Sequence, residues 1–212
     1  MQTMKKWCLA GLILASLTGA AASQSVQSDD FQQRMTTALT SAKKSADQLN
    51  DQQKALLDAI NLAADPQQAR KFLDNLIGTS TSALTTFGEK GEVMKAINDL
   101  LVSVDQRRKN AEDRAASDPR WVERVAVWKG HADNLRQLRQ DLLKEVDRAE
   151  NTLTQLSKDR TFIEDIIASE GVERARKEME AALMNLRDLG DSLANAVKIA
   201  EERNRKISAP AS

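Results

Sequence analysis

The longest hydrophobic pattern in the chain consists of two interleaved rows between residues 121 and 167. One row recurs at every seventh position and contains Trp121, Trp128, Leu135, Leu142, Ala149, Leu156 and Ile163. The other begins four residues later and contains Val125, Ala132, Arg139, Val146, Leu153, Arg160 and Ile167. Alternating steps of four and three residues place both rows on one face of an α-helix. Sustained over several heptads, this spacing is typical of a coiled coil or a long bundle helix.

Residues that favour helix ends flank this pattern. Asp118 is a good N-cap, Pro119 fits the first helical position, and Gly171 is a suitable stop. We therefore predict one helix over residues 119–169, about 75 Å long at about 1.5 Å per residue. The alternative is a helix that continues through Gly171, because a glycine inside a helix costs only about 1 kcal/mol.

Similar spacing predicts four further helices. A C-terminal helix over 172–206 follows a short turn at Gly171, so we expect it to fold back on its predecessor. Nearer the N-terminus, a first helix covers about residues 28–63, and Asp65 and Pro66 begin a short helix over 66–77. Threonine, serine and glycine dominate residues 79–91, which predicts an irregular connection before a helix over 91–116.

Together these elements predict an all-α fold. It is an elongated antiparallel helical bundle with coiled-coil (heptad) seams, made of four long helices and one short helix. One domain covers residues 23–207, and residues 208–212 form a disordered tail. The composition agrees, since there are only three prolines and no tyrosine, and most abundant residue types favour helices. Gln53 and the arginines at seam positions either set the register or face solvent where one helix overhangs the others.

The N-terminus has the pattern of a secretory signal peptide over residues 1–22. Lys5 and Lys6 precede an apolar stretch that ends at Leu17, and Ala20 and Ala22 form an A-x-A cleavage signal. The alternative is a retained membrane anchor, but spanning a bilayer takes about 20 apolar residues. We therefore expect a periplasmic or secreted protein after cleavage near Ala22, with no integral membrane span.

Composition and motifs argue against several kinds of chemistry. The chain has 31 basic and 31 acidic residues, so it lacks the basic excess of most nucleic-acid-binding domains. The only cysteine lies in the predicted signal peptide and there is a single histidine, which excludes zinc sites of Cys and His ligands and di-iron bundle sites. No Walker loop, G-x-G-x-x-G or G-x-S-x-G motif occurs. We expect no metal, no cofactor and no enzymatic activity.

The stretch with two tryptophans and the histidine is the candidate for partner binding. Its candidate residues are Trp121, Trp128, His131, Leu135 and Leu138. Large apolar residues on a surface mark partner sites. The simplest interpretation, which the heptad row favours over binding, is that both tryptophans are core residues in the same row as Leu135, with His131 half-exposed on the flank of the helix.

Two functions fit a helical protein that lacks catalytic equipment. The first is a structural or adaptor protein of the cell envelope, whose coiled-coil surfaces bind a protein partner or a second copy. The second is a periplasmic chaperone or envelope-stress protein that binds unfolded clients. The segment Leu49-Asn50-Asp51-Gln52-Gln53 resembles the Leu-Thr-x-x-Gln motif of Spy and CpxP-like periplasmic chaperones, with asparagine in place of threonine. That resemblance implies a concave surface for clients.

The signal-peptide pattern makes a direct prediction about the secreted product. We expect the exported protein to begin near Ser23. Intact-mass spectrometry of the periplasmic or secreted fraction measures this. A product that retains residues 1–22 would contradict cleavage.

Overall fold

The chain folds as an all-α helical bundle. A computed structural model describes residues 18–60, 65–169 and 171–208. The regular elements in these ranges are α1 (Thr18–Ile60), α2 (Pro66–Phe87), α3 (Glu92–Ala115), the short 3-10 helix η1 (Pro119–Trp121), α4 (Val122–Ser169), α5 (Val172–Leu186) and α6 (Leu189–Ser208). Residues 1–17 of the predicted signal peptide and residues 209–212 of the predicted tail lie outside the described residues.

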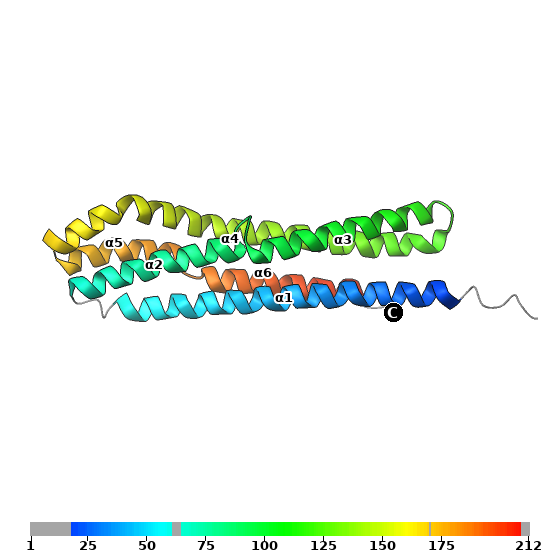
Figure 1. The fold of residues 1–212 in the computed structure, drawn as a ribbon, viewed down its shortest axis with the longest axis horizontal. Coiled ribbons are helices and arrows are strands. Elements are labelled where there is room, and N and C mark those ends of the chain that lie inside the picture. Colours follow the sequence, from blue (N-terminus) through cyan, green and yellow to red (C-terminus); the bar gives the residue numbers. More distant parts are fainter. Residues whose placement is uncertain (1–17, 61–64, 170, 209–212) are drawn as a thin grey trace, which may run out of the picture.

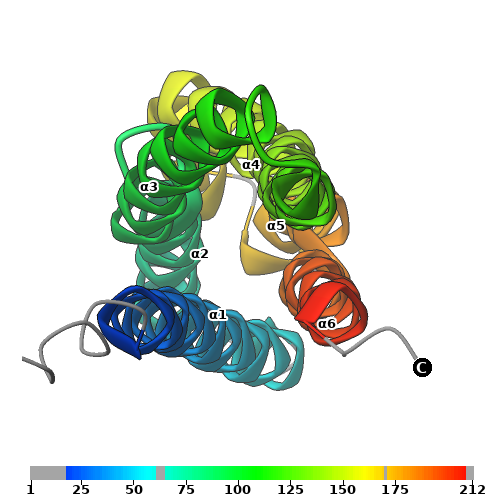
Figure 2. The same ribbon diagram turned by 90° about the vertical axis from the view of Figure 1, so that its right-hand side faces the viewer.

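The helices lie lengthwise along the long axis of the molecule (Figure 1). α1 occupies one side, α2 and α3 follow one another along a second side, α4 runs beside them, and α5 and α6 follow one another along the last side (Figure 1). Viewed from the end, α1 lies between α2 and α6, with α4 on the opposite side (Figure 2). The helices therefore surround one shared interior.

That interior is built from the apolar rows. From Leu135 to Ile163, the first row of α4 is buried throughout. The two arginines of the second row avoid the interior. Arg139 makes an ion pair with Glu89 at 3.6 Å, and Arg160 makes one with Asp74 at 2.9 Å. These arginines thus bridge α4 to its neighbours at the edge of the core.

α1 and α2 are both longer than the sequence pattern predicts. α1 begins at Thr18 instead of near residue 28, and the alanines at 20–22 suit this extension because alanine has the highest helix propensity. α2 continues through Gly78 to Phe87, so the predicted end at residue 77 is wrong. Four hydroxyls of α2 donate to the carbonyl four residues earlier, at 2.9–3.0 Å: those of Thr79, Ser80, Thr81 and Thr85. This bonding fits these polar side chains to a helix, and the connection to α3 shrinks to residues 88–91.

α4 has the extent predicted for the helix over 119–169, apart from its first turn. The carboxylate of Asp118 accepts a hydrogen bond from the backbone N–H of Arg120 at 3.1 Å, and η1 leads directly into α4. At the other end, Gly171 has φ 92°, in the left-handed region that favours glycine. The alternative of one helix that continues through Gly171 is therefore wrong.

The predicted helix over 172–206 is also wrong, because the chain breaks between α5 and α6. Asp188 at the break has φ 63°, which no continuous helix allows. Gln53 of α1 is 4% exposed and lies against this break. Its Nε2 donates to the Leu186 carbonyl at 2.6 Å, and its Oε1 accepts from the Gly190 N–H at 3.0 Å. One side chain thus satisfies a carbonyl at the end of α5 and an N–H at the start of α6.

Close packing explains why glycine occupies position 190. A Cβ at this position would lie 2.7 Å from the backbone of Asn50 in α1, which is closer than atoms pack. The Asn50 side chain also donates to Asp191 at 2.7 Å. On the other side, Arg148 of α4 donates to the carbonyls of Asn185 and Arg187 at 3.2 and 3.0 Å. The break is therefore held from both α1 and α4.

Replacing Gln53 with alanine is expected to destabilise the protein by about 2–4 kcal/mol, because two buried backbone groups lose their partner. Chemical denaturation followed by circular dichroism measures this loss. Gln52 is exposed on the same helix, so Gln52→Ala is the matched control and should change stability by at most about 0.5 kcal/mol. Equal effects of the two variants would show that Gln53 does not hold the break.

Candidate functional site

The predicted partner-binding residues are divided between the interior and its edge. His131 is 1% exposed, and Leu135 and Leu138 are equally buried. The expectation of a half-exposed histidine is therefore wrong. Trp121 and Trp128 are each half-buried. In this conformation only the two tryptophans offer any surface to a partner, and the use of this stretch for binding stays a prediction.

Trp128 belongs to an aromatic cluster that joins α1 to α4. Its ring meets Phe31 edge-on, with centroids 5.2 Å apart, and lies 5.7 Å from the ring of His131. The guanidinium of Arg107 from α3 covers Phe31 at 5.5 Å and Trp128 at 5.3 Å. Such ring and cation–π contacts each contribute about 0.5–1.5 kcal/mol. Packing between three helices thus accounts for Trp128.

Trp121 lies at the end of the bundle where α3 leads into α4. The guanidinium groups of Arg114 and Arg124 lie 4.5 and 5.0 Å from its ring centroid. Both partners come from the helices that η1 connects. The indole therefore helps to fasten this turn.

His131 takes part in a chain of polar side chains between α1, α4 and α6, in which His131 and Asn204 are buried and Gln32 is half-buried. Asn204 donates from Nδ2 to the Gln32 Oε1 at 3.2 Å, and the Nε2 of Gln32 lies 3.2 Å from the Nε2 of His131. The Gln32 amide is the donor in that contact, so the imidazole accepts at Nε2 and carries its proton on Nδ1. Burial lowers the pKa of His131 to about 4, although the nearby Asn204 side chain acts in the opposite direction. The imidazole is therefore neutral at pH 7.

Three atoms of this buried cluster have no hydrogen-bond partner among the described residues. They are the Nδ1 of His131 and the Oδ1 atoms of Asn134 and Asn204. The Nδ2 of Asn134 does donate to the Ala200 carbonyl at 2.9 Å. Buried polar atoms without a partner lower the stability of the folded protein. The cluster therefore contributes more to fixing one arrangement of α1, α4 and α6 than to stability.

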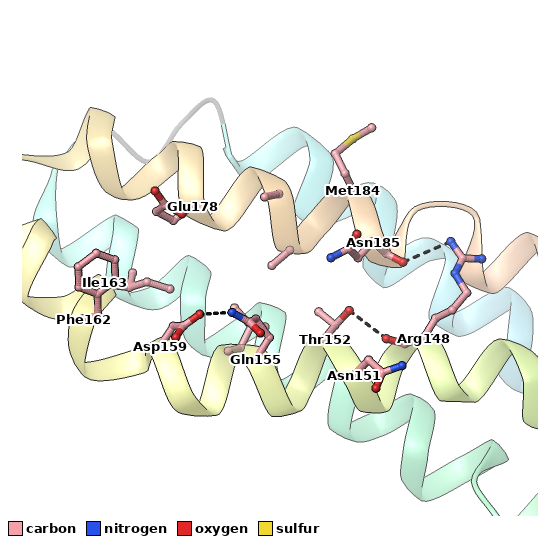
Figure 3. A pocket seen from close by; sticks show the side chains of 13 residues that line it. Arg148, Asn151, Thr152, Gln155, Asp159, Phe162, Ile163, Glu178, Met184 and Asn185 are labelled. Atoms are coloured by element: carbon pink, nitrogen blue, oxygen red, sulfur yellow. Dashed lines mark hydrogen bonds between the residues drawn. The ribbon is translucent and has the colours of Figure 1, made fainter.

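A groove on the surface lies between α4 and α5. Its volume is about 720 Å³, and Figure 3 shows side chains from both helices facing across it. Arg148, Thr152 and Asp159 line it from α4, while Glu178 and Asn185 line it from α5 (Figure 3).

Two large apolar side chains of the groove are exposed to solvent. Phe162 of α4 is 55% exposed and Met184 of α5 is 52% exposed. Exposed apolar surface beside polar groups is typical of protein-binding surfaces. Sequence reasoning missed both residues because it followed the buried rows, and Phe162 lies one position before the row residue Ile163. The available signal was a large apolar residue on an otherwise polar face of the helix.

The charged side chains of the groove already interact with neighbouring residues. Arg148 pairs with Glu145 at 3.0 Å, and Glu178 pairs with Arg174 at 3.4 Å. Asp159 accepts a hydrogen bond from Gln155. Within the ranges that the structure describes, no group of three His, Cys, Asp or Glu side chains is placed to hold a metal ion. The arrangement offers apolar contact framed by paired charges, which suits the binding of a protein surface.

Comparison with known proteins adds no family to this picture. The chain matches no protein-family model, no curated protein and no solved structure. Among the described helices, none has both the length and the apolar character that a membrane crossing needs.

Acidification is expected to destabilise the protein through His131. Its pKa of about 4 in the folded protein lies below the ordinary value of 6.5, so the unfolded chain takes up this proton first as the pH falls. The stabilisation is complete above about pH 6.5 and is lost by about pH 4, with a magnitude of about 3 kcal/mol. Denaturation of the wild type and of His131→Gln at several pH values measures it.

Both proteins contain the same carboxylates, so the effect of carboxylate titration on stability cancels when the wild type is compared with His131→Gln. Between pH 7 and pH 4, the free energy of unfolding of the wild type should fall by about 3 kcal/mol relative to that of His131→Gln. A difference that stays constant with pH would contradict a buried neutral imidazole.

Proposed function

We propose that this protein is an exported, non-enzymatic helical bundle that binds another protein chain through the groove between α4 and α5. The observation that carries the proposal is the exposure of Phe162 and Met184 on the two walls of the groove. When a partner covers large exposed apolar residues, their surface is removed from water. Each Å² of apolar surface buried in this way contributes about 25 cal/mol to the free energy of binding.

The shape required for such a function is that of an elongated antiparallel bundle with coiled-coil seams. α4 alone has 48 residues, or about 72 Å at 1.5 Å per residue. A rod of this length offers an extended surface for a partner helix in the helix-in-groove manner. With export directed by the N-terminal pattern, the corresponding role is that of a structural or adaptor protein of the cell envelope.

The chaperone alternative receives less support from the residues that suggested it. In the segment that resembles the Spy and CpxP-like motif, Leu49 is buried and Gln53 holds the break between α5 and α6. Both therefore have structural roles inside the bundle and are not available to a client. The adaptor role remains the better supported proposal.

Photo-crosslinking in cells tests the groove. With benzoylphenylalanine in place of Phe162, we expect a discrete crosslinked product. Val102 of α3 is 72% exposed and gives the matched control, from which that product should be absent. Met184→Lys should abolish the product from position 162, because it charges the opposite wall of the groove, whereas Val102→Lys should leave it unchanged.

The products also separate the two functions. An adaptor yields one dominant product, whereas a chaperone yields many products of different mass. Equal labelling from positions 162 and 102 would overturn the groove as a binding surface.

A further inference from the structure

The charges on the outer face of α4 follow an order that bears on what binds the groove. Between residues 144 and 165, six charged residues lie within about 60° of Phe162 around the helix, at about 100° per residue. In chain order they are Lys144, Asp147, Arg148, Lys158, Asp159 and Asp165. Asp159 is partly buried and the other five are exposed. Their signs run plus, minus, plus, plus, minus, minus.

The charges also divide between two flanks of this face. At about 100° per residue, Asp147 and Lys158 lie on one side of Phe162 and Arg148 and Asp159 on the other, so an antiparallel copy brings charges of the same flank together. When the helix direction is reversed, Lys144 exchanges with Asp165, Asp147 with Lys158, and Arg148 with Asp159, and each exchange joins opposite charges. The midpoints of these three pairs all fall between positions 152 and 155, within about 3 Å of one another along the helix. The two residues of this face nearest the midpoints, Asn151 and Gln155, carry no charge.

We infer that the surface formed by α4 and the groove binds a second copy of this chain, with the two α4 helices antiparallel about a two-fold axis near position 154. This inference rests on the proposed function, because it names the occupant of the same surface. A two-fold interface uses one patch on both copies, so the patch must complement itself. The antiparallel arrangement places opposite charges together at all three pairs, whereas a parallel one would set each charge against its own kind.

The apolar residues fit the same arrangement. Phe162 of one copy comes to lie over residues 144–148 of the other, where a lysine and an arginine offer methylene stems and cations to the ring. Because Arg148 donates to the carbonyl of Asn185, the neighbouring Met184 lies close to Arg148, about 9 Å along α4 from the axis. The dimer thus covers both exposed side chains that define the groove.

Charge reversal with rescue tests the inference on the purified protein. Sedimentation equilibrium should show a dimer that dissociates on dilution and weakens with added salt, which screens exposed charge pairs. Lys144→Glu places like charges together twice in each dimer and should raise the dissociation constant about 10-fold. The double variant Lys144→Glu with Asp165→Lys restores the opposite signs, and its dissociation constant should return to within about 3-fold of the wild type.

Cysteine crosslinking locates the axis. In a background with Cys8→Ser, Gln155→Cys should form a disulfide-linked dimer on oxidation, since the two copies of this residue lie near the axis. Gln140→Cys is the matched control, because this exposed glutamine lies on the same face but about 40 Å from its own copy along the antiparallel helices.

Three results would overturn the inference. They are a monomer at all concentrations, equal crosslinking of the two cysteine variants, and a double variant that dissociates like Lys144→Glu. A monomer whose position 162 still crosslinks to one different protein would remove the second copy as the occupant and leave the proposed function intact. Absence of any specific crosslink from position 162 would remove the proposed function itself.

Discussion

The burial of one narrow apolar stripe on each helix is the constraint on which the rest of the structure depends. The helices are long, and nearly all of their buried apolar residues form one hydrophobic cluster. This cluster consists mainly of leucine, isoleucine, valine, methionine and alanine, together with Phe31, Phe72 and Phe87. Alanine in these rows lets the helix backbones approach closely. The approach at Gly190 is so close that even a Cβ would clash with Asn50 of α1. Stability is therefore spread along the rod, and no single layer dominates it.

A uniform apolar stripe does not by itself decide how far one helix slides along another, since shifting by a heptad offers similar burial. Buried polar groups remove that freedom because their hydrogen bonds form at one position only. Gln53 sets α1 against the break between α5 and α6. The chain of Gln32, His131 and Asn204 sets α1 against α4 and α6. These two clusters lie about 30 Å apart along α1 and together fix its position.

The exposed apolar residues of the groove stand out because most large apolar side chains of the chain are buried. Where most large apolar side chains are needed for the interior, Phe162 and Met184 stand in water on the walls of one groove. The six charges beside them include three pairs of opposite sign that an antiparallel second copy brings together. In the proposed dimer, Phe162 and Met184 would supply binding energy, and the charges would favour the antiparallel orientation of the two α4 helices. This division between apolar contact and charge is common at protein interfaces.

Heptad spacing in the sequence was enough to determine the all-α class, the extent of the helix over 119–169 and the turn at Gly171, because these depend on local periodicity and backbone preference. The length of α2 was missed because its serine and threonine hydroxyls bond to the helix itself, which composition does not reveal. The break at Asp188 was decided by tertiary structure, since it depends on Gln53, more than 130 residues away in the chain. The burial of His131 was also decided there, because spacing along α4 alone does not show that Phe31 and Gln32 of α1 cover its flank. The sequence predicted the contact between the two walls of the groove, because the short turn at Gly171 folds the next helix back on α4. The exposure of Phe162 and Met184 along that contact was decided by tertiary packing.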